Sequence, residues 1–428
     1  MEYIILISII FIFISLKDLR FSLGLIFLSL PLYQIRFEFF QVPLTLLELW
    51  IIIFLIIWLI KHFSFSKLNN LFKSLGKWKW ISLAWVFVGL ISIFIAPEIK
   101  PALGSFKAFF LEPVLLFIIG FDVIKTRKDL SIILGFGILM AIIISFWAIS
   151  QKFLGGGIMS LEVFGQPKIW RATGPFPHPN FLGLLLGPIL VLGLSWFLSF
   201  KNKIIYTSLA IFFVIILGTA LFFAKSEGAI IGAIAGLFII FLFKKPKISL
   251  ISLVLILILV FSIPGFRSFV FKKATFSDLS GKLRLNIWDG AVNLLSDNFI
   301  LGVGLCGYQK LIPGIQKSYF DKETKKLVSV ETHPYPHNLF LALWLELGIL
   351  GIVVFLWLIA RFFYLGILKL KKVKSEFKMQ ILGVIGAMSC TLIHGLVDTP
   401  YFKNDLSVLF WFLILFMVFL QNKKESYY

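Results

Sequence analysis

The sequence predicts an all-α polytopic membrane protein with about 12–13 transmembrane helices, from two observations. First, 59% of the 428 residues are hydrophobic and only 14% are charged. The mean hydropathy of +0.99 is too high for a soluble domain, whose surface must meet water. Second, apolar runs recur along the whole chain, many of them close to the ~20 residues that cross ~30 Å of hydrocarbon as a helix.

The runs divide the chain into three parts. Residues 1–263 hold the first ten spans, residues 264–336 form a long, partly helical outer loop, and residues 337–428 hold the C-terminal spans. The first run begins "MEYIILISII" and lacks the basic flank and cleavage site of a signal peptide, so it is interpreted as a helix. We expect spans near residues 3–16, 21–34, 43–60, 80–96, 108–124, 130–150, 180–200, 204–223, 229–243, 248–263, 338–360, 379–396 and 405–420.

The distribution of lysine and arginine predicts the orientation. One alternating set of loops, which includes "KTRK" at 125–128 and "KKPK" at 244–247, carries more than half of the 41 basic residues. Cytoplasmic loops carry this excess. We therefore expect the 264–336 loop to face the periplasm or exterior of a bacterial-type inner or plasma membrane, with the C-terminus cytoplasmic.

The net charge of +20 has a topological interpretation. Cytoplasmic lysines meet anionic head groups of membrane lipids. The sequence contains no basic face of a soluble module, so no nucleic acid is expected as a partner. Cys306 and Cys390 form neither a disulfide framework nor a metal motif.

Polar side chains gather at the outer ends of the spans. With this orientation, four of the five histidines lie at or near the outer face, and only His62 is cytoplasmic. We expect the polar segments to line one pocket at the outer leaflet. They are "WRATGPFPHPNFLG" (170–183), "AKSEGA" (224–229), "GKLRLNIWDGAVNLL" (281–295), the histidine segment 332–338 and "HGLVDTPYFKND" (394–405).

Two arginines in these segments are candidate phosphate ligands. Arg284 and Trp288 share one face of a predicted interfacial helix over 281–295. Arg171 precedes a proline-stiffened loop that also holds His178. A guanidinium is planar, permanently charged and able to bind phosphate bidentately. The alternatives are an interfacial anchor for Arg284 and a lipid head-group contact for Arg171.

His337 is a candidate base, because imidazole accepts a proton near neutral pH. It follows Pro336 and directly precedes Asn338 and an apolar helix, so the alternative is a passive residue in a pre-helical turn. Glu346 lies nine residues further on, about half a turn around the helix, and cannot orient His337 within that helix. We expect Glu346 to form an interhelical hydrogen bond.

The segment "GVGLCG" (302–307) contains the glycine spacing of a dinucleotide-binding loop. That spacing has meaning only after a strand and before a helix, with an acidic residue about 20 positions on. Here the segment lies in the predicted outer loop, where nicotinamide cofactors are absent. It is interpreted as a glycine-rich turn, and no cofactor is expected.

Over about residues 165–400 the chain resembles the O-antigen ligase and polymerase family of polysaccharide assembly. The similarity is carried, in order, by "RATGPFPHPNFLG", Ser226 and Gly228, "LRLNIWDGA", "HPYPHNLFLALWLELGILG" and "HGLVD". The resemblance implies a glycosyltransferase of the GT-C type that acts in cell-envelope polysaccharide biosynthesis, as in lipopolysaccharide. Its donor would be a glycan on undecaprenyl diphosphate, and its acceptor a hydroxyl of a glycolipid, glycan or protein.

The resemblance also implies roles for individual residues. His337 corresponds to the base that activates the acceptor, and Arg171 and Arg284 to diphosphate contacts. The family commonly has arginine directly after the serine of the 224–229 turn, whereas this chain has Glu227 there and Lys225 before the serine. The expected substrate-binding residues are Arg171, Arg284, Lys225, Asn338, His178, His394 and Asp398. No metal ligand is expected, since guanidinium groups can stabilise the charge of the leaving diphosphate.

Two other functions remain as alternatives. A lipid-linked polysaccharide flippase would fit the number of spans, but transport predicts polar groups or broken helices near the bilayer midplane. A metalloenzyme could use His178, His333, His337, His394 and Asp398, provided that their separate loops converge. Within the transferase interpretation, no residue separates a ligase from a polymerase.

Overall fold

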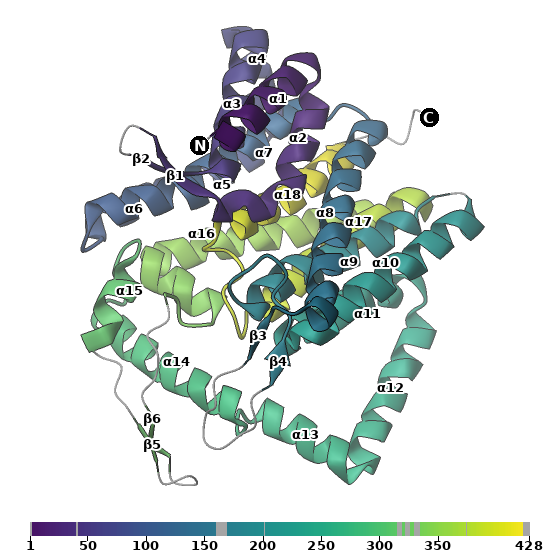
Figure 1. The fold of residues 1–428 in the computed structure, drawn as a ribbon. Coiled ribbons are helices and arrows are strands. Elements are labelled where there is room, and N and C mark those ends of the chain that lie inside the picture. The colour runs from purple at the N-terminus through teal and green to yellow at the C-terminus, as the bar shows by residue number, and fades with distance from the viewer. Residues whose placement is uncertain are drawn as a thin grey trace.

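A computed structural model of the chain describes residues 2–39, 42–159, 169–200, 202–314, 319–321, 326–328, 334–373 and 375–422. These residues are mostly helical (Figure 1). The strands in this part of the chain form three antiparallel two-stranded hairpins, which are β1 (Arg36–Phe39) with β2 (Val42–Thr45), β3 (Ile158–Met159) with β4 (Trp170–Arg171), and β5 (Tyr319–Asp321) with β6 (Lys326–Val328).

The helices follow one another with short connections. The first half contains α1 (Glu2–Lys17), α2 (Leu19–Leu28), a 3-10 turn (Leu30–Gln34), α3 (Leu46–His62), α4 (Phe65–Leu75), α5 (Trp78–Ile95), α6 (Ile99–Phe106), a π-helical turn (Lys107–Leu111), α7 (Glu112–Val123), α8 (Arg127–Leu154) and α9 (Pro179–Phe197). The second half contains α10 (Lys203–Ala224), α11 (Glu227–Lys244), α12 (Pro246–Ser262), α13 (Pro264–Ala274), α14 (Leu279–Asp297), α15 (Gly307–Leu311), a 3-10 turn (Ile312–Gly314), α16 (Leu339–Leu370), α17 (Ser375–His394) and α18 (Asn404–Asn422).

Among the described residues, nine helices are long and apolar enough to span a bilayer, or ten if α3 and α4, bent by 118°, count as one span. This confirms the all-α polytopic membrane fold, and nine of the thirteen expected spans appear. The runs at 3–16, 21–34, 43–60 and 248–263 form shorter helices. The 21–34 run shows why: Pro31 has no N–H to continue a helix, so α2 ends at Leu28 and a 3-10 turn follows.

Helix α18 forms the centre of the bundle. All residues from Asp405 to Leu420 are buried, and α18 packs against α7, α16 and α17. The buried Tyr401, just before α18, accepts hydrogen bonds from the indoles of Trp85 (2.7 Å) and Trp411 (3.2 Å). Its hydroxyl donates to the carbonyl of Phe109 (2.7 Å). Because a buried polar group needs such partners, Tyr401 fixes the segment between α17 and α18.

Helices α11 and α17 meet through glycine. A Cβ on Gly236 would lie 2.5 Å from the carbonyl oxygen of Gly386, and one on Gly386 would lie 2.8 Å from that of Gly236. Small residues let two helix backbones approach closely, which is a common packing mode between helices in membranes. This contact holds the start of α11 beside the end of α17.

Helix α16 is interrupted at Gly348, whose φ of 67° and ψ of −171° are not helical. The predicted glycine-rich turn after α14 fills the interruption. The N–H of Val303 donates to the Leu345 carbonyl (2.6 Å), and the N–H of Ile349 donates to the Ile300 carbonyl (3.0 Å). Backbone groups freed by a break at membrane depth need partners of this kind.

Glu346 also bonds to this turn. The expected interhelical hydrogen bond is wrong in its partner, because one Glu346 carboxylate oxygen accepts from the backbone N–H of Cys306. Cys306 lies in the turn just before α15, and the Glu346 backbone carbonyl accepts from the Ser92 hydroxyl of α5 (2.7 Å). The break therefore joins the outer segment to the transmembrane bundle.

We expect Gly348→Ala to lower stability, because its Cβ would lie 2.3 Å from the Ile300 carbonyl at a positive φ. Backbone strain of this type costs about 1–3 kcal/mol before the clash is counted. Thermal unfolding of the purified protein in detergent measures the effect. Gly218→Ala in α10 is the matched control, since its Cβ would meet nothing within 4 Å. Equal melting temperatures for the two variants would contradict this account of the break.

Candidate functional site

The candidate site lies where four segments meet: the loop before α9, the turn between α10 and α11, the start of α16 and the loop after α17. The N–H of Leu339 donates to the Gly395 carbonyl (2.7 Å), and the side-chain amide of Asn338 donates to the Leu396 carbonyl (3.1 Å). These two bonds set the residue before α16 beside the residues that follow α17. They explain how His337 and Asp398 come together.

Asp398 is the buried acceptor of the site. One carboxylate oxygen lies 3.2 Å from Nδ1 of His337 and accepts from the Thr399 N–H (2.8 Å). The other accepts from the side-chain amide of Asn180 (3.1 Å) and lies 4.0 Å from Nε2 of His394. Burial alone would raise the pKa of Asp398, but the His337 hydrogen bond and the neighbouring groups lower it below its usual range. Asp398 is therefore a carboxylate at neutral pH.

His337 has a backbone conformation that is rare for a side chain with a Cβ. Its φ is 48°, and a quarter of its side chain is exposed. Non-glycine residues held at positive φ are enriched at functional sites. If Nδ1 carries the proton toward Asp398, then Nε2 carries the lone pair that can accept another proton. This tautomer is the one that a base needs.

Arg171 leaves the β3–β4 hairpin and binds the end of α10. Its Nε donates to the Ala224 carbonyl (2.8 Å), and its Nη2 donates to the Lys225 carbonyl (3.2 Å) and to Oδ1 of Asn180 (2.9 Å). The remaining nitrogen, Nη1, has no hydrogen bond to a described residue. Asn180 thus connects Arg171 to Asp398, which leaves one edge of the guanidinium for a ligand.

Arg284 approaches from the outer segment on α14, the helix predicted over 281–295. Its Nε donates to the Val397 carbonyl (3.0 Å), next to Asp398, and its Nη1 donates to the Ser280 hydroxyl (2.6 Å). Its Nη2 has no hydrogen bond to a described residue. Figure 1 shows α13 and α14 running along one side of the molecule, so this arm carries the second guanidinium to the loop after α17.

The turn between α10 and α11 supplies two further charges. Lys225 is exposed at a left-handed C-cap (φ 49°), and its ammonium forms no ion pair with a described residue. Glu227, which stands where the family commonly has arginine, forms an ion pair with Lys273 of α13 (2.6 Å). Lys273 also pairs with Asp278 (2.7 Å). The sequence did not indicate that α13 brings a cation to this turn.

The other candidate residues have structural contacts. Asn338 caps α16 by accepting from the N–H groups of Phe340 and Leu341 (3.0 Å each). His178 caps α9 through its Nδ1 (3.2 Å to the Asn180 N–H), and burial and Arg171 lower its pKa to about 4, so it is neutral at pH 7. His394 is buried, and a Cβ on Gly228 would lie 2.6 Å from its ring. His333 lies outside the described residues.

Two residues near the site were missed by the sequence analysis. Asn180 bridges Arg171 and Asp398, but at the first turn of a helix it resembles an ordinary cap residue. Lys403 is the other: its ammonium lies 4.1–4.9 Å from the ring centroids of Tyr33, Phe176 and Phe181 and 3.2 Å from Asp405. Cations bind aromatic faces. Lys403 thereby joins the loop after α17 to the loop before α9.

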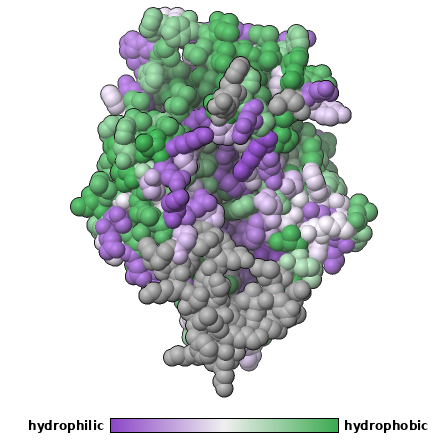
Figure 2. Space-filling model, turned by 60° about the vertical axis from the view of Figure 1, so that its left-hand side comes forward, coloured by the Kyte–Doolittle hydropathy of each residue, from purple (hydrophilic) through white to green (hydrophobic). Residues whose placement is uncertain are grey.

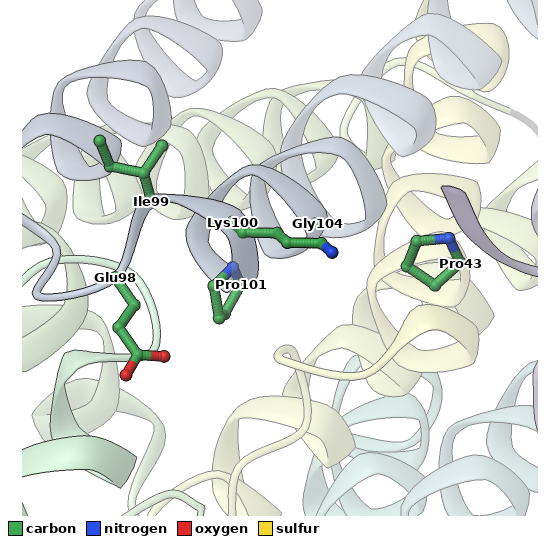
Figure 3. A pocket seen from close by; sticks show the side chains of 6 residues that line it. All are labelled: Pro43, Glu98, Ile99, Lys100, Pro101 and Gly104. Carbon is green, nitrogen blue, oxygen red and sulfur yellow. The ribbon is translucent and has the colours of Figure 1, made fainter. Parts of the chain in front are cut away.

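The site is distinct from the larger cavity of the described part of the chain. That cavity, about 640 Å³, is lined by Pro43, Glu98, Ile99, Lys100, Pro101 and Gly104 near the start of α6 (Figure 3). None of the candidate site residues lines it. On the face that Figure 2 brings forward, hydrophilic side chains surround a hollow flanked by hydrophobic surface. Within the described residues, no group of three or more His, Cys, Asp or Glu side chains could hold a metal ion.

The fold defines a multi-pass helical membrane protein with a base, a buried carboxylate and two arginines gathered at the ends of its helices. Residues 211–356 match the family model described as O-antigen ligase, which supports the assignment of the chain to the O-antigen ligase and polymerase family. The match covers Lys225, Arg284, His337 and Asn338. None of the curated proteins compared with the chain matches it.

The family match confirms the predicted resemblance and supports a glycosyltransferase activity of the O-antigen ligase type in polysaccharide biosynthesis. The family implies a lipid-linked glycan donor and an acceptor in the membrane. The match gives no support to the alternative of a flippase.

We expect Asn180→Ala to reduce glycan transfer about 10–100-fold, the range typical of a residue that orients a functional side chain. The substitution removes the bridge between Arg171 and Asp398 without removing either charge. A transfer assay with membranes and a lipid-linked glycan measures the loss. Asn202→Ala is the matched control, because Asn202 caps α10 with a 3.4 Å hydrogen bond and contacts none of the site residues. Equal activity of both variants would show that the bridge has no role.

Proposed function

We propose that the chain transfers a glycan from an undecaprenyl diphosphate carrier to an acceptor hydroxyl at the outer face of a bacterial-type inner or plasma membrane. The observation that carries this proposal is the contact between His337 Nδ1 and Asp398 Oδ1 (3.2 Å), with two arginines bound to the neighbours of Asp398. The family match over residues 211–356 supports the reaction class.

His337 is the proposed base. Asp398 accepts the Nδ1 proton and favours the tautomer whose Nε2 lone pair faces away from the carboxylate. Nε2 takes the proton of the acceptor hydroxyl as the oxygen forms a bond to the anomeric carbon of the donor. The bond between that carbon and the phosphate oxygen breaks, and the electron pair leaves with the diphosphate. Attack opposite the leaving group inverts the anomeric configuration.

The cations are the proposed diphosphate ligands. Arg171 Nη1 and Arg284 Nη2 are donors without a described hydrogen-bond partner, and the Lys225 ammonium is exposed beside them in the chain. Donors held in place before the reaction stabilise charge that develops on the leaving group. Because guanidinium groups can do this, the proposed reaction needs no divalent ion. The substrate-facing roles of His178, His394 and Asn338 are secondary, since these side chains cap or pack helices.

The proposed topology places the site outside and the C-terminus in the cytoplasm. It rests on the basic loops 125–128 and 244–247, which lie at the opposite ends of α8 and α11 from the site. We propose residues 1–263 and 337–428 as transmembrane parts and 264–336 as the outer segment. The acceptor is a glycolipid, a glycan or a protein, so the enzyme is a ligase or a polymerase. The break in α16 does not favour transport, because Val303 and Ile300 occupy its backbone groups.

We expect His337→Ala to lower transfer by at least about 100-fold, because general-base catalysis contributes about 10²–10⁴. The measurement is glycan transfer in membranes supplied with lipid-diphosphate glycan and acceptor. His333→Ala is the matched control, since this second histidine of the same segment is not the one next to Asp398, and it should keep most of the activity. Equal tolerance of both changes would remove His337 from the mechanism.

We expect Arg284→Lys to weaken donor binding about tenfold or more while the protein remains folded. Lysine keeps the charge but cannot reach Val397, Ser280 and a phosphate with one planar group. Binding of the lipid-diphosphate donor to purified protein measures the change. Arg267→Lys on the exposed surface of α13 is the control. Wild-type donor affinity in Arg284→Lys would contradict its role as a phosphate ligand.

A further inference from the structure

A second cationic pocket lies among the helix ends where the basic loops gather. It has a volume of about 410 Å³ and is lined by residues from the ends of α1, α3 and α7, the starts of α2 and α4, and the loop before α8. The lining residues are Lys17, Asp18, Leu19, Arg20, Lys61, His62, Lys67, Asp122, Val123 and Lys125. Five lysine and arginine side chains face two carboxylates, so the lining carries an excess of positive charge.

The carboxylates hold several of these cations in place. Asp122 accepts from Lys125 (2.8 Å), from Lys67 (3.1 Å) and from the indole of Trp58 (2.9 Å). Arg20 is held between Asp18 (2.6 Å) and Asp129 (3.0 Å). Charged groups fixed in this way keep their positions without a ligand. The pocket is therefore ordered in advance for an anion.

Two lysines in the pocket remain available to a ligand. The ammonium of Lys61 donates to the Leu16 carbonyl but has no acidic partner among the described residues. The ammonium of Lys17 forms no hydrogen bond or ion pair with a described residue. An ammonium has three donors, so both side chains can bind phosphate oxygens.

The surroundings of the pocket indicate which kind of phosphate it would bind. Helix α4 is strongly amphipathic and turns by 118° from α3, as expected for a helix that lies in the membrane interface. Exposed apolar side chains border the pocket at this bend: Ile60 (76%), Phe63 (51%) and Phe65 (82%). A free anion would use only the charges. A phospholipid would use the charges for its phosphate and these side chains for its acyl chains.

We propose that this pocket binds the phosphate of an anionic phospholipid. Basic pockets between transmembrane helices bind such head groups. The proposal does not depend on the transferase reaction, because none of the pocket residues belongs to the site of His337 and Asp398. It assigns a specific lipid contact to α1–α4 and α7, the part of the chain that precedes the family match.

The test uses the full-length protein purified in a nonionic detergent. Native mass spectrometry measures the binding of dioleoylphosphatidylglycerol, with dioleoylphosphatidylcholine as the neutral lipid and inorganic phosphate as a competitor. The pocket variant is Lys17→Gln together with Lys61→Gln. The matched control is Lys73→Gln together with Lys79→Gln, which removes the same charge from the neighbouring helices but not from the pocket.

We expect the pocket variant to bind phosphatidylglycerol at least tenfold more weakly than wild type, and the control to change by less than threefold. Millimolar inorganic phosphate should not displace the lipid. Equal losses in the two variants, or equal retention of the two lipids by wild type, would overturn the proposal. Displacement by inorganic phosphate would reassign the pocket to a free anion. If the double variant fails to fold, Lys17→Gln alone carries the same test, because its ammonium has no contact to lose.

Discussion

The candidate site depends on one buried carboxylate. Asp398 accepts from His337, Thr399 and Asn180 and lies near His394, so a single side chain connects the starts of α9 and α16 with the end of α17. A carboxylate without partners would be costly to bury in such a protein. The same contacts that satisfy Asp398 therefore fix the imidazole of His337 and, through Asn180, the guanidinium of Arg171. Structural stability and the proposed chemistry rest on the same hydrogen bonds.

The membrane imposes the same requirement elsewhere in the fold. The interruption of α16 frees backbone groups that lipid cannot satisfy, and residues 300–306 bond to them. This attachment connects the end of the outer segment to the bundle. At its other end, Lys273 of α13 pairs with Glu227 at the start of α11. Tied at both ends, the arm formed by α13 and α14 holds Arg284 over the loop after α17.

The sequence predicted the fold class and the polar segments, because hydropathy and helical periodicity are local properties. It also predicted the helix that carries Arg284. The number of spans was overcounted, since an apolar run does not show where a proline or a cap ends a helix, as at Asp18 and Pro31. The convergence of the segments was expected only from their common side of the membrane.

The pairings within the site could not be predicted. Asn180 and Asp398 are 218 positions apart, and nothing local in either segment indicates their hydrogen bond. Glu346 was assigned to another helix, but its partner is a backbone N–H in a turn that looked like a simple connection. Lys273 shows the same limit: its partner Glu227 looked like the loss of a cation rather than the attachment point of one.

The central claim is that Asp398 tunes His337 as the base, and the pH profile of glycan transfer tests it most directly. The acid limb of kcat/KM reports the group that must be unprotonated in the free enzyme. A neighbouring carboxylate stabilises imidazolium, so its removal should lower the pKa of the base. We expect Asp398→Asn to reduce the rate and to move the acid limb to lower pH. A profile with an unmoved acid limb and a wild-type rate would contradict the account.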